Sequence, residues 1–490
     1  MKHSLAMLFM CAVVSAGCTQ PRPIAVDGFT DDWAPGATVA ADSDYLYFKV
    51  SFTQMRSLWR GDESVVIAID LDADDTTGDI GAIEPGADLV VQTNVAVEGD
   101  RRARAVVTGY AAAGDPVVIE QSVSRLHAQP TYASDVYELR IRRNPDFAGH
   151  VPTDALLGSG TVEVAIARFD AVTGEPVART TRAELELPPF DPQTRLSDRP
   201  IPPKPTDGVR VLAYNVLWSG PTKAEPGPEP FARLLQSADP DVVFLQEWYD
   251  RELDRGKTPA QLAAQVEAWF DTHVGDGPWR AVGSVARGVF VVSRYDLLDA
   301  GPEELSAEPN SRWDFPVRLA SAVFDSPHGP LVVGSVHLKC CGSLGTEEDV
   351  RRLDEARVIN DTLETMAATG TGFLPVILGG DYNHNGHPRV VRTMVEDLDT
   401  DATELLTLNA RVFGTDDVYT YGTPDRGYRR SRLDYFSVPD SVFEVAQSFV
   451  IDTTRMSVAA LDASELEADD IEGSDHLPVV ADLVPIERRD

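Results

Sequence analysis

A proline-rich segment divides this chain into two parts with different hydrophobic patterns. Residues 188–207 run from Pro188-Pro189 to Pro205 with prolines throughout. Proline has no backbone N–H and favours an extended conformation in the residue before it, so such a run resists packing into a helix or sheet. The chain has 490 residues, enough for two domains. We therefore expect a first domain over residues 22–190, a linker over 191–207 and a second domain over 208–485.

The first domain is expected to be an all-β sandwich. Short runs rich in β-branched and aromatic residues are separated by Gly, Asp and Pro, a pattern typical of strands joined by tight turns. Many such strands in one domain favour two packed antiparallel sheets. The clearest runs are Tyr45–Val50, Val65–Ile69, Tyr137–Arg142 and Thr161–Arg168.

Three segments of this domain are similar to carbohydrate-binding-like sandwich modules. They are Val26–Trp33, Tyr45–Tyr47 and Asp70–Asp72. The resemblance implies a surface glycan as a partner. Trp33 could stack on a sugar ring, although sandwich cores also hold tryptophans and core packing is favoured.

An acidic loop follows one of the expected strands. Asp70, Asp72 and Asp74 alternate along it, and carboxylate oxygens are ligands that Ca²⁺ prefers. The EF-hand pattern is not met, because no Glu follows at the required distance. Two interpretations stay open: a Ca²⁺ site made by these three residues, or an acidic turn exposed to water.

The second domain alternates apolar strand-like runs with helical patterns, which predicts an α/β domain with sheets inside and helices outside. The expected helices are Phe231–Ser237, Pro259–Phe270 and Glu347–Ala367. The expected strands are Val209–Ala213, Asp241–Leu245, Val289–Val292, Leu331–Val336 and Val376–Leu378.

Polar residues stand at the ends of several of these strands. Asn215, Glu247 and Asp381 each follow an apolar run, and Asp475 and His476 are neighbours near the end of the chain. Carboxylates, an amide and an imidazole brought together in this way can form one metal-assisted hydrolytic centre.

Six motifs occur in the order found in the endonuclease/exonuclease/phosphatase superfamily. They are Ala213-Tyr214-Asn215-Val216, Leu245-Gln246-Glu247, Ser335-Val336-His337-Leu338, Gly380-Asp381-Tyr382-Asn383, Arg432-Leu433-Asp434-Tyr435 and Ser474-Asp475-His476. Residues 208–485 thus resemble this superfamily, which includes deoxyribonucleases, sphingomyelinases and inositol-phosphate phosphatases. The resemblance implies an α/β four-layer sandwich, two packed β-sheets flanked by helices, and a metal-dependent hydrolase of phosphate esters.

The resemblance also implies roles for individual residues. The expected ligands of a catalytic Mg²⁺ or Mn²⁺ ion are Asn215, Glu247 and Asp475. The expected catalytic residues are His337, Asp381, Asn383, Asp434 and His476. Asp434 would hydrogen-bond His476, which would act as the base or contact the phosphate. Asn383 and Arg318 are expected to contact the substrate phosphate.

The net charge of −35 bears on the substrate. A field of this sign disfavours tight nonspecific binding of nucleic acid, although a bound cation can reverse it locally. Hydrolysis of a phosphodiester in nucleic acid is the first interpretation, because it is the commonest activity of the superfamily. A phospholipid or a small phosphate ester is the alternative substrate. An interpretation of another class is a non-catalytic glycan-binding lipoprotein.

The N-terminus has the pattern of a bacterial lipoprotein signal peptide. Lys2 and His3 precede the apolar run Leu5–Val14, and small residues then precede Cys18. We expect residues 1–17 to be removed, Cys18 to be lipidated, and the protein to be anchored in the cell envelope at the outer membrane or the periplasmic face. Ordinary secretion is the alternative. Cys340 and Cys341 are adjacent, and both a disulfide and two thiols are open.

Overall fold

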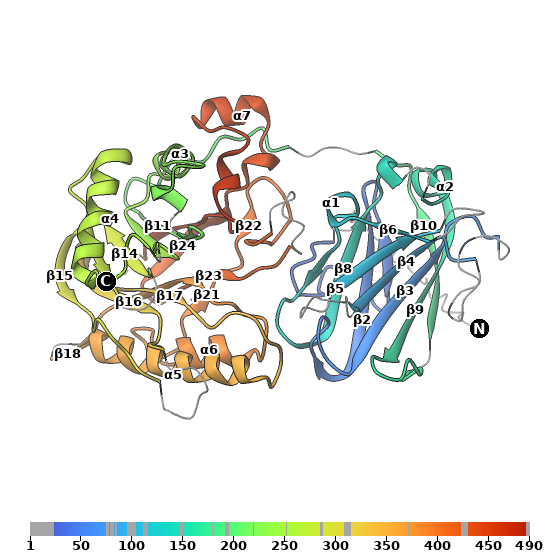
Figure 1. Ribbon diagram of the computed structural model, residues 1–490, viewed down its shortest axis with the longest axis horizontal. Helices are drawn as coiled ribbons and strands as arrows, with labels where there is room; N and C mark the ends of the chain where they lie inside the picture. Colours follow the sequence, from blue (N-terminus) through green and yellow to red (C-terminus); the bar gives the residue numbers. More distant parts are fainter. Residues whose placement is uncertain are drawn as a thin grey trace, which may run out of the picture.

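Two lobes lie side by side, an N-terminal lobe made almost entirely of strands and a C-terminal lobe with helices on its outside (Figure 1). The computed structural model describes residues 24–486 except 75–77, 79–82, 84–85, 96–103, 111–115, 148–149, 179, 192–195, 219, 251, 285–287, 308–314, 371 and 423–429. The expected signal peptide and Cys18 lie outside the described residues. Within the described part of the chain, no helix is long and apolar enough to cross a membrane.

The N-terminal lobe is the expected all-β sandwich. Its two sheets have the strand orders β1-β2-β8-β7 and β10-β9-β3-β4-β5-β6. The strands are β1 Val39–Ala41, β2 Tyr45–Arg56, β3 Glu63–Asp70, β4 Leu89–Val95, β5 Arg104–Gly109, β6 Val117–Ile119, β7 His127–Gln129, β8 Ser134–Arg142, β9 Gly160–Asp170 and β10 Thr181–Leu187, with short helices α1 Gln121–Ser124 and α2 Thr153–Leu157. Alternate residues such as Leu46 and Phe48 of β2 are buried between the sheets.

Trp33 packs in the interior of this lobe. It is buried, and its Nε1–H donates to Glu138 Oε1 at 2.6 Å. Its ring is therefore not presented to a glycan, and the favoured expectation of core packing agrees with the structure.

The C-terminal lobe contains two large sheets packed face to face. One has the order β13-β14-β12-β11-β25-β24-β22 and the other β15-β16-β17-β20-β23-β21. The strands are β11 Val209–Asn215, β12 Val242–Gln246, β13 Arg280–Gly283, β14 Phe290–Ser293, β15 Asp296–Ala300, β16 Leu319–Ser326, β17 Gly329–His337, β20 Val376–Asp381, β21 Leu406–Thr407, β22 Arg411–Val412, β23 Asp434–Val438, β24 Phe443–Val450 and β25 Val479–Pro485. A small hairpin of β18 Ala368–Thr369 and β19 Gly372–Phe373 stands apart from both sheets.

Helices cover the outer face of each sheet. They are α3 Glu229–Ala238, α4 Pro259–His273 and α7 Val458–Ala463 on the first sheet, and α5 Glu347–Ala367 and α6 Arg389–Val395 on the second (Figure 1). Sequence signals set these boundaries. Helix α4, for example, begins after Thr258, which exchanges side-chain hydrogen bonds with Gln261 in a capping box. The expected α/β four-layer sandwich is confirmed.

The described part of the linker lies along the C-terminal lobe. Ser197 N–H donates to Arg455 O at 2.7 Å, and Ile201 N–H donates to Ser464 Oγ at 2.9 Å. Residues 196–207 are thus packed on the second domain despite their prolines.

Candidate active site

Strand topology brings the polar residues to one edge of the two sheets. The pairs β11/β12 and β17/β20 are parallel, so their carboxyl ends point the same way within each sheet. Strands β23 and β25 are antiparallel to their neighbours and therefore start at that same edge. The residues delivered are Asn215, Glu247, His337 and Asp381 at strand ends, and Asp434 and His476 at or just before strand starts.

Asp381 lies at the centre of this group. It is the register partner of His337 on one side and of Asp434 on the other. From the facing sheet, Asn215 Nδ2 donates to Asp381 Oδ2 at 3.2 Å. The two sheets therefore meet at Asp381.

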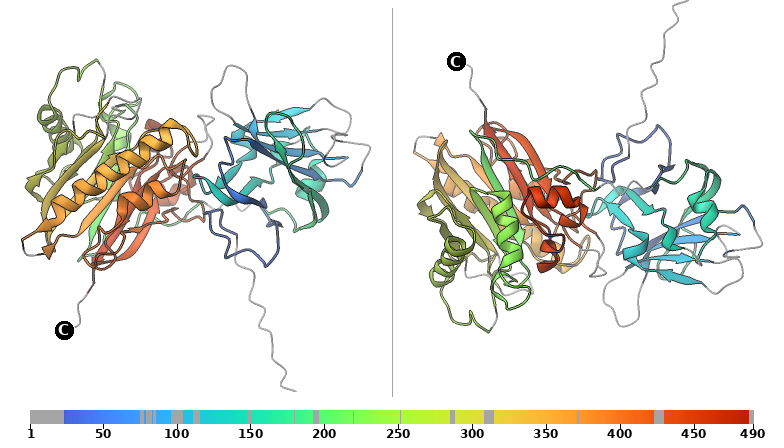
Figure 2. Two further views of the ribbon diagram at one scale, coloured as in Figure 1. Left: turned by 90° about the horizontal axis from the view of Figure 1, so that it is seen from below. Right: turned by 90° about the horizontal axis from the view of Figure 1, so that it is seen from above.

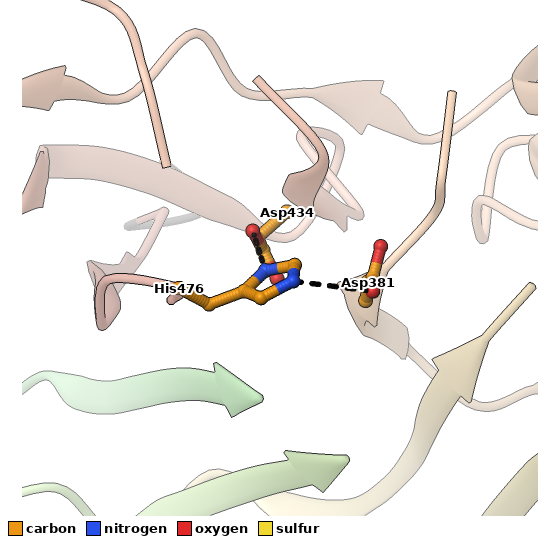
Figure 3. Close-up of side chains that lie close together, drawn as sticks. All are labelled: Asp381, Asp434 and His476. Atoms are coloured by element: carbon orange, nitrogen blue, oxygen red, sulfur yellow. Dashed lines mark hydrogen bonds and ion pairs between the residues drawn. The ribbon is translucent and has the colours of Figure 1, made fainter. Parts of the chain in front are cut away.

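His476 lies between two carboxylates. Its Nδ1 is 2.8 Å from Asp434 Oδ2 and its Nε2 is 3.7 Å from Asp381 Oδ2, and all three residues are buried (Figure 3). Burial lowers the pKa of His476, but the charges of Asp434 and Asp381 outweigh burial and raise this pKa to about 10. Burial raises the pKa of Asp381 to about 7, against the opposing charge of His476.

Thr420 holds Asp434 in place. Thr420 Oγ1 donates to Asp434 Oδ2 at 2.6 Å and accepts the backbone N–H groups of Leu433 and Asp434, each at 3.0 Å. Thr420 is not among the residues predicted from the sequence. A single threonine in the loop before β23 has no pattern of its own, so only the fold reveals its contact.

Arg318 lies against His337. The Arg318 guanidinium is 3.2 Å from His337 Nδ1 and donates to Leu338 O at 2.5 Å, and the side chain is buried. A guanidinium can only donate, so Nδ1 accepts and the ring proton resides on Nε2. That Nε2 lies 3.4 Å from Asp381 Oδ2. Arg318 therefore orients His337, and its expected contact with the substrate phosphate stays a prediction.

Glu247 and Asn215 have the chemistry of a cation site. Within the described residues, Glu247 Oε2 is buried without a hydrogen-bond partner, and burial raises the pKa of this carboxyl. Its backbone is also in the left-handed region, at φ +61°. An unpaired buried carboxylate oxygen is costly, and a divalent cation bound by oxygen ligands would satisfy it.

Asp475 and Asn383 lie close to the other residues of the site, and their expected roles stay predictions. The charge of Asp475 contributes to the raised pKa of Glu247, but the tight ligand cluster found here consists of Asp381, Asp434 and His476. Asn383 N–H donates to Asp381 Oδ1 at 2.9 Å, and its side-chain amide donates to Leu338 O at 3.2 Å. Asn383 therefore orients Asp381 through its backbone N–H.

Two thiols follow His337 in the next loop. No disulfide joins Cys340 and Cys341, whose Sγ atoms lie 3.1 Å apart. The hydrogen bond from Cys341 lowers the pKa of Cys340 to about 5. Of the two open interpretations, the structure has the reduced pair.

The sequence model described as the Endonuclease/Exonuclease/phosphatase family matches residues 212–476. The chain belongs to this family. The match spans more than half of the chain and includes all the residues of the candidate active site. Membership in the Endonuclease/Exonuclease/phosphatase family makes the chain a metal-dependent hydrolase of phosphate ester bonds, as the motif order predicted.

Solved structures of this fold align with slightly more than half of the chain. Sphingomyelinase C from Streptomyces griseocarneus is 19% identical with a TM-score of 0.38, covering 56% of this chain and 99% of that chain. A humanized D. rerio TDP2 is 16% identical (TM-score 0.36; 57% and 99% covered), and a family protein from Leptotrichia buccalis is 15% identical (0.36; 56% and 99%). No curated protein matches the chain at significant similarity.

A second group of carboxylates lies in the N-terminal sandwich. Oxygens of Asp70, Asp72 and Asp88 lie within 4.8 Å of one another. Asp74, which was expected to belong to this group, is exposed and outside it. Asp88 takes its place, because β4 pairs with β3 and brings Asp88 beside the acidic loop.

Asp88 is the buried member of this group. It is fully buried, and its Oδ2 accepts from Leu71 N–H at 2.8 Å. Its Oδ1 has no hydrogen-bond partner among the described residues. Burial raises the pKa of Asp88 to about 7, and the charges of Asp72 and Asp70 add to this shift.

Proposed function

We propose that the chain hydrolyses phosphodiester bonds at the edge of its two C-terminal sheets. The observation that carries the proposal is the position of the His476 ring, with Asp434 at 2.8 Å on one side and Asp381 at 3.7 Å on the other. A phosphodiester is anionic and resists attack by hydroxide. His476 and its two carboxylates form a buried group with proton donors and a proton acceptor. Such a group can stabilise the negative charge that develops on the phosphate and can transfer the protons that the reaction needs.

Glu247 and Asn215 would hold the divalent cation, with Asp475 as a further carboxylate. One or two carboxylates with substrate oxygens and water suit Mg²⁺ or Mn²⁺. When bound, the ion neutralises the phosphate charge and stabilises the leaving oxygen.

The hydrogen bonds of the two histidines suggest their roles. A carboxylate only accepts, so Asp434 keeps a proton on His476 Nδ1 and directs Nε2 toward the substrate. His337 also presents a proton on Nε2, because Arg318 occupies its Nδ1. Both Nε2 atoms face Asp381. We therefore assign Asp381 as the acceptor that orients the attacking water, and the histidines as donors to the phosphate and the leaving oxygen.

A nucleic acid is the proposed substrate, supported by membership in a family named for its endonucleases and exonucleases. The net charge of −35 implies that long polyanions bind weakly, so the reaction would depend on the metal and not on a basic binding surface. A phospholipid is the second candidate, because the proposed lipid anchor would hold the site near a membrane.

Hydrolysis assays test these proposals. The full chain would be incubated with bis-p-nitrophenyl phosphate, plasmid DNA and sphingomyelin vesicles, in Mg²⁺ and in EDTA, beside the His476→Asn variant. Metal-dependent nicking of the plasmid that the variant lacks would support the nuclease proposal. Turnover of the vesicles alone would replace it with a lipid phosphodiesterase, and no turnover of any diester would contradict the proposed function.

We also propose that the protein is exported and anchored through Cys18. The support is the apolar run Leu5–Val14 followed by small residues before Cys18. The full gene product would be fractionated beside a Cys18→Ser variant. Membrane association and a mass increase of a lipid in the parent, both lost in the variant, are expected. Soluble parent protein without added mass would contradict the anchor.

A Ca²⁺ ion is proposed for the group of Asp70, Asp72 and Asp88. The support is the unpaired buried oxygen of Asp88 beside two further carboxylates. A ligand at a hundred times its Kd stabilises the folded state by about 2.7 kcal/mol. We therefore expect Ca²⁺ to raise the Tm of the sandwich by roughly 5 °C. Asp88→Asn should abolish this shift and Asp74→Asn should keep it; no shift in the parent would reject the site.

A further inference from the structure

The N-terminal sandwich is docked on the segments that carry the catalytic carboxylate and histidine. Strand β7 forms a bridge from His127 to Arg430, and Asp27 forms an ion pair with Arg411 at 3.2 Å. Figure 2 shows the two lobes side by side from two further directions. We propose that the sandwich is a positioning element of the active site, in which Thr131 and Arg140 hold Asp434 and His476 in their reactive arrangement. The proposal rests on the proposed roles of Asp434 and His476.

The last residue of β7 and the loop between β7 and β8 make the first set of contacts. Gln129 Nε2 donates to Val418 O at 3.3 Å, and Thr131 Oγ1 accepts the backbone N–H of Arg432 at 3.1 Å. Thr131 is buried, and Arg432 is two residues before Asp434 in the chain. This loop therefore fixes the backbone that leads directly into the catalytic strand β23.

The same loop reaches the segment that follows Asp381. Ala133 N–H donates to Gly386 O at 2.9 Å. The ring of Tyr132 stacks on the buried His384, with ring centroids 4.4 Å apart. One loop of the sandwich thus contacts the chain on both sides of the catalytic group.

A buried ion pair makes the second set of contacts. Arg140 of β8 pairs with Asp417 of the loop after β22, and both side chains are buried. Arg430 and Arg455 lie 3.9 Å from the other oxygen of Asp417. Burial raises the pKa of Asp417, but the three arginines outweigh it and hold this pKa well below its usual range. Asp417 is therefore a charged anchor for its loop, and one of its partners comes from the sandwich.

Asp417 lies three residues before Thr420, the residue that holds the carboxylate partner of His476. Thr420 donates to Asp434 Oδ2 at 2.6 Å, and that same oxygen is 2.8 Å from His476 Nδ1. The next residue, Tyr421, forms a bridge with His476 and places its ring 4.9 Å from the imidazole. A shift of the loop would therefore displace both the carboxylate partner and the ring of His476.

Loss of the contacts between the lobes should affect the rate of turnover and not the binding of substrate. Arg140 and Thr131 are not themselves among the metal or phosphate ligands proposed above, so their loss should leave substrate binding largely intact. A displacement of about 1 Å at a catalytic group can lower a rate by up to about a hundredfold. Loss of the docking contacts should therefore lower kcat and leave KM nearly unchanged.

The first experiment compares full-length variants on bis-p-nitrophenyl phosphate at saturating Mg²⁺. Arg140→Gln is expected to lower kcat about tenfold with KM within about twofold, and Arg140→Lys to recover most of the loss. Arg142→Gln is the matched control, because Arg142 lies on the same strand but pairs with Asp44 inside the sandwich at 3.0 Å. Thr131→Val, which removes the acceptor for Arg432 N–H and the donor to Gln129 Oε1 at 3.3 Å, should lower kcat in the same way. An unchanged kcat in both Arg140→Gln and Thr131→Val would overturn the proposal.

A measurement that needs no activity separates this proposal from the proposed function. The Nδ1–H proton of His476, held by Asp434, should give a downfield ¹H resonance that His476→Asn removes. Arg140→Gln should shift or broaden this resonance, and Arg142→Gln should not. If the parent hydrolyses no diester but the resonance responds in this way, the proposed function fails and the positioning role stands. If the resonance is the same in Arg140→Gln as in the parent, the positioning role fails.

Discussion

Glu247 holds a buried carboxylate oxygen for which the described residues provide no partner. Replacing it by Gln removes a charge that burial disfavours and that a cation would satisfy. For Glu247→Gln we expect the Mg²⁺ concentration at half-maximal activity to rise at least about tenfold. We also expect stability in EDTA to increase, by roughly 1 kcal/mol, because the unpaired charge is gone. Activity as a function of Mg²⁺ and thermal melting in EDTA would measure these effects.

The exposed Glu252, in the loop after β12, provides the control for this substitution. Glu252→Gln should change neither quantity. An unaltered Mg²⁺ dependence in Glu247→Gln would remove Glu247 from the proposed metal site.

Arg318 determines which nitrogen of His337 carries the proton. Without it, the proton can move to Nδ1, and the Nε2 that faces Asp381 becomes an acceptor. We expect Arg318→Met to lower kcat about tenfold or more, since a histidine in the wrong tautomer cannot donate where it should. Steady-state kinetics would compare it with Arg357→Met, which removes an exposed guanidinium from α5. Equal kcat values for the two variants would contradict the orienting role.

At the scale of an element, the end of strand β20 places Asp381 between the two sheets. Gly380 has φ +132°, and a Cβ on it would lie 2.3 Å from Val336 O of the neighbouring strand β17. Only glycine allows the strands to pair this closely at the residue before the catalytic carboxylate. We therefore expect Gly380→Ala to destabilise the protein by about 3 kcal/mol and to abolish activity.

Urea unfolding would measure this effect against Gly329→Ala. Gly329 also has a positive φ, +99°, but a Cβ on it would meet nothing within 4 Å. Gly329→Ala thus introduces the unfavourable φ without a steric clash. It should lower the free energy of unfolding by only about 1 kcal/mol. Equal losses in the two variants would show that the contact with β17 is unimportant.

At the scale of the whole molecule, the contact between the lobes includes the fully buried His127. Burial lowers the pKa of His127 to about 3; the charges of Arg140 and Arg430 add to this shift, and that of Asp417 opposes it. The pKa of an unfolded histidine is about 6.5, so the unfolded chain binds the additional proton between these values. The contribution of His127 to the free energy of unfolding is therefore fully present above about pH 6.5. It falls as the pH decreases, by up to about 1.4 kcal/mol per pH unit.

A His127→Phe variant tests this pH dependence. Between pH 7.5 and pH 5, its stability relative to the parent should improve by about 2 kcal/mol, because the phenylalanine has no proton to bind. Thermal melts at several pH values would measure the difference, with the half-buried His273→Phe as the control. A relative stability of His127→Phe that does not change with pH would contradict the assignment.

The elements and most of the residues at their ends could be predicted from the order of the amino acids alone. Continuous apolar runs predicted β11, β12, β17 and β20, because a strand buried on both faces is apolar throughout. Apolar residues at helical spacing predicted the helix α5 with its observed boundaries. Polar residues that interrupt such runs, such as Asn215 and Asp381, could be recognised because little else explains them there. Motif order then identified the family.

Which polar side chains contact one another could not be predicted in this way and became known only from the folded chain. Several contacts join residues that are far apart in the sequence or that belong to no recognisable motif. They are the contacts of Thr420 with Asp434, of Asp88 with Asp70 and of Arg140 with Asp417. Arg318 also contacts His337, which its position in the sequence did not indicate. The physical reason is that hydrophobic periodicity reports local burial, whereas the partner of a polar atom depends on strand register and on the packing of one lobe against the other.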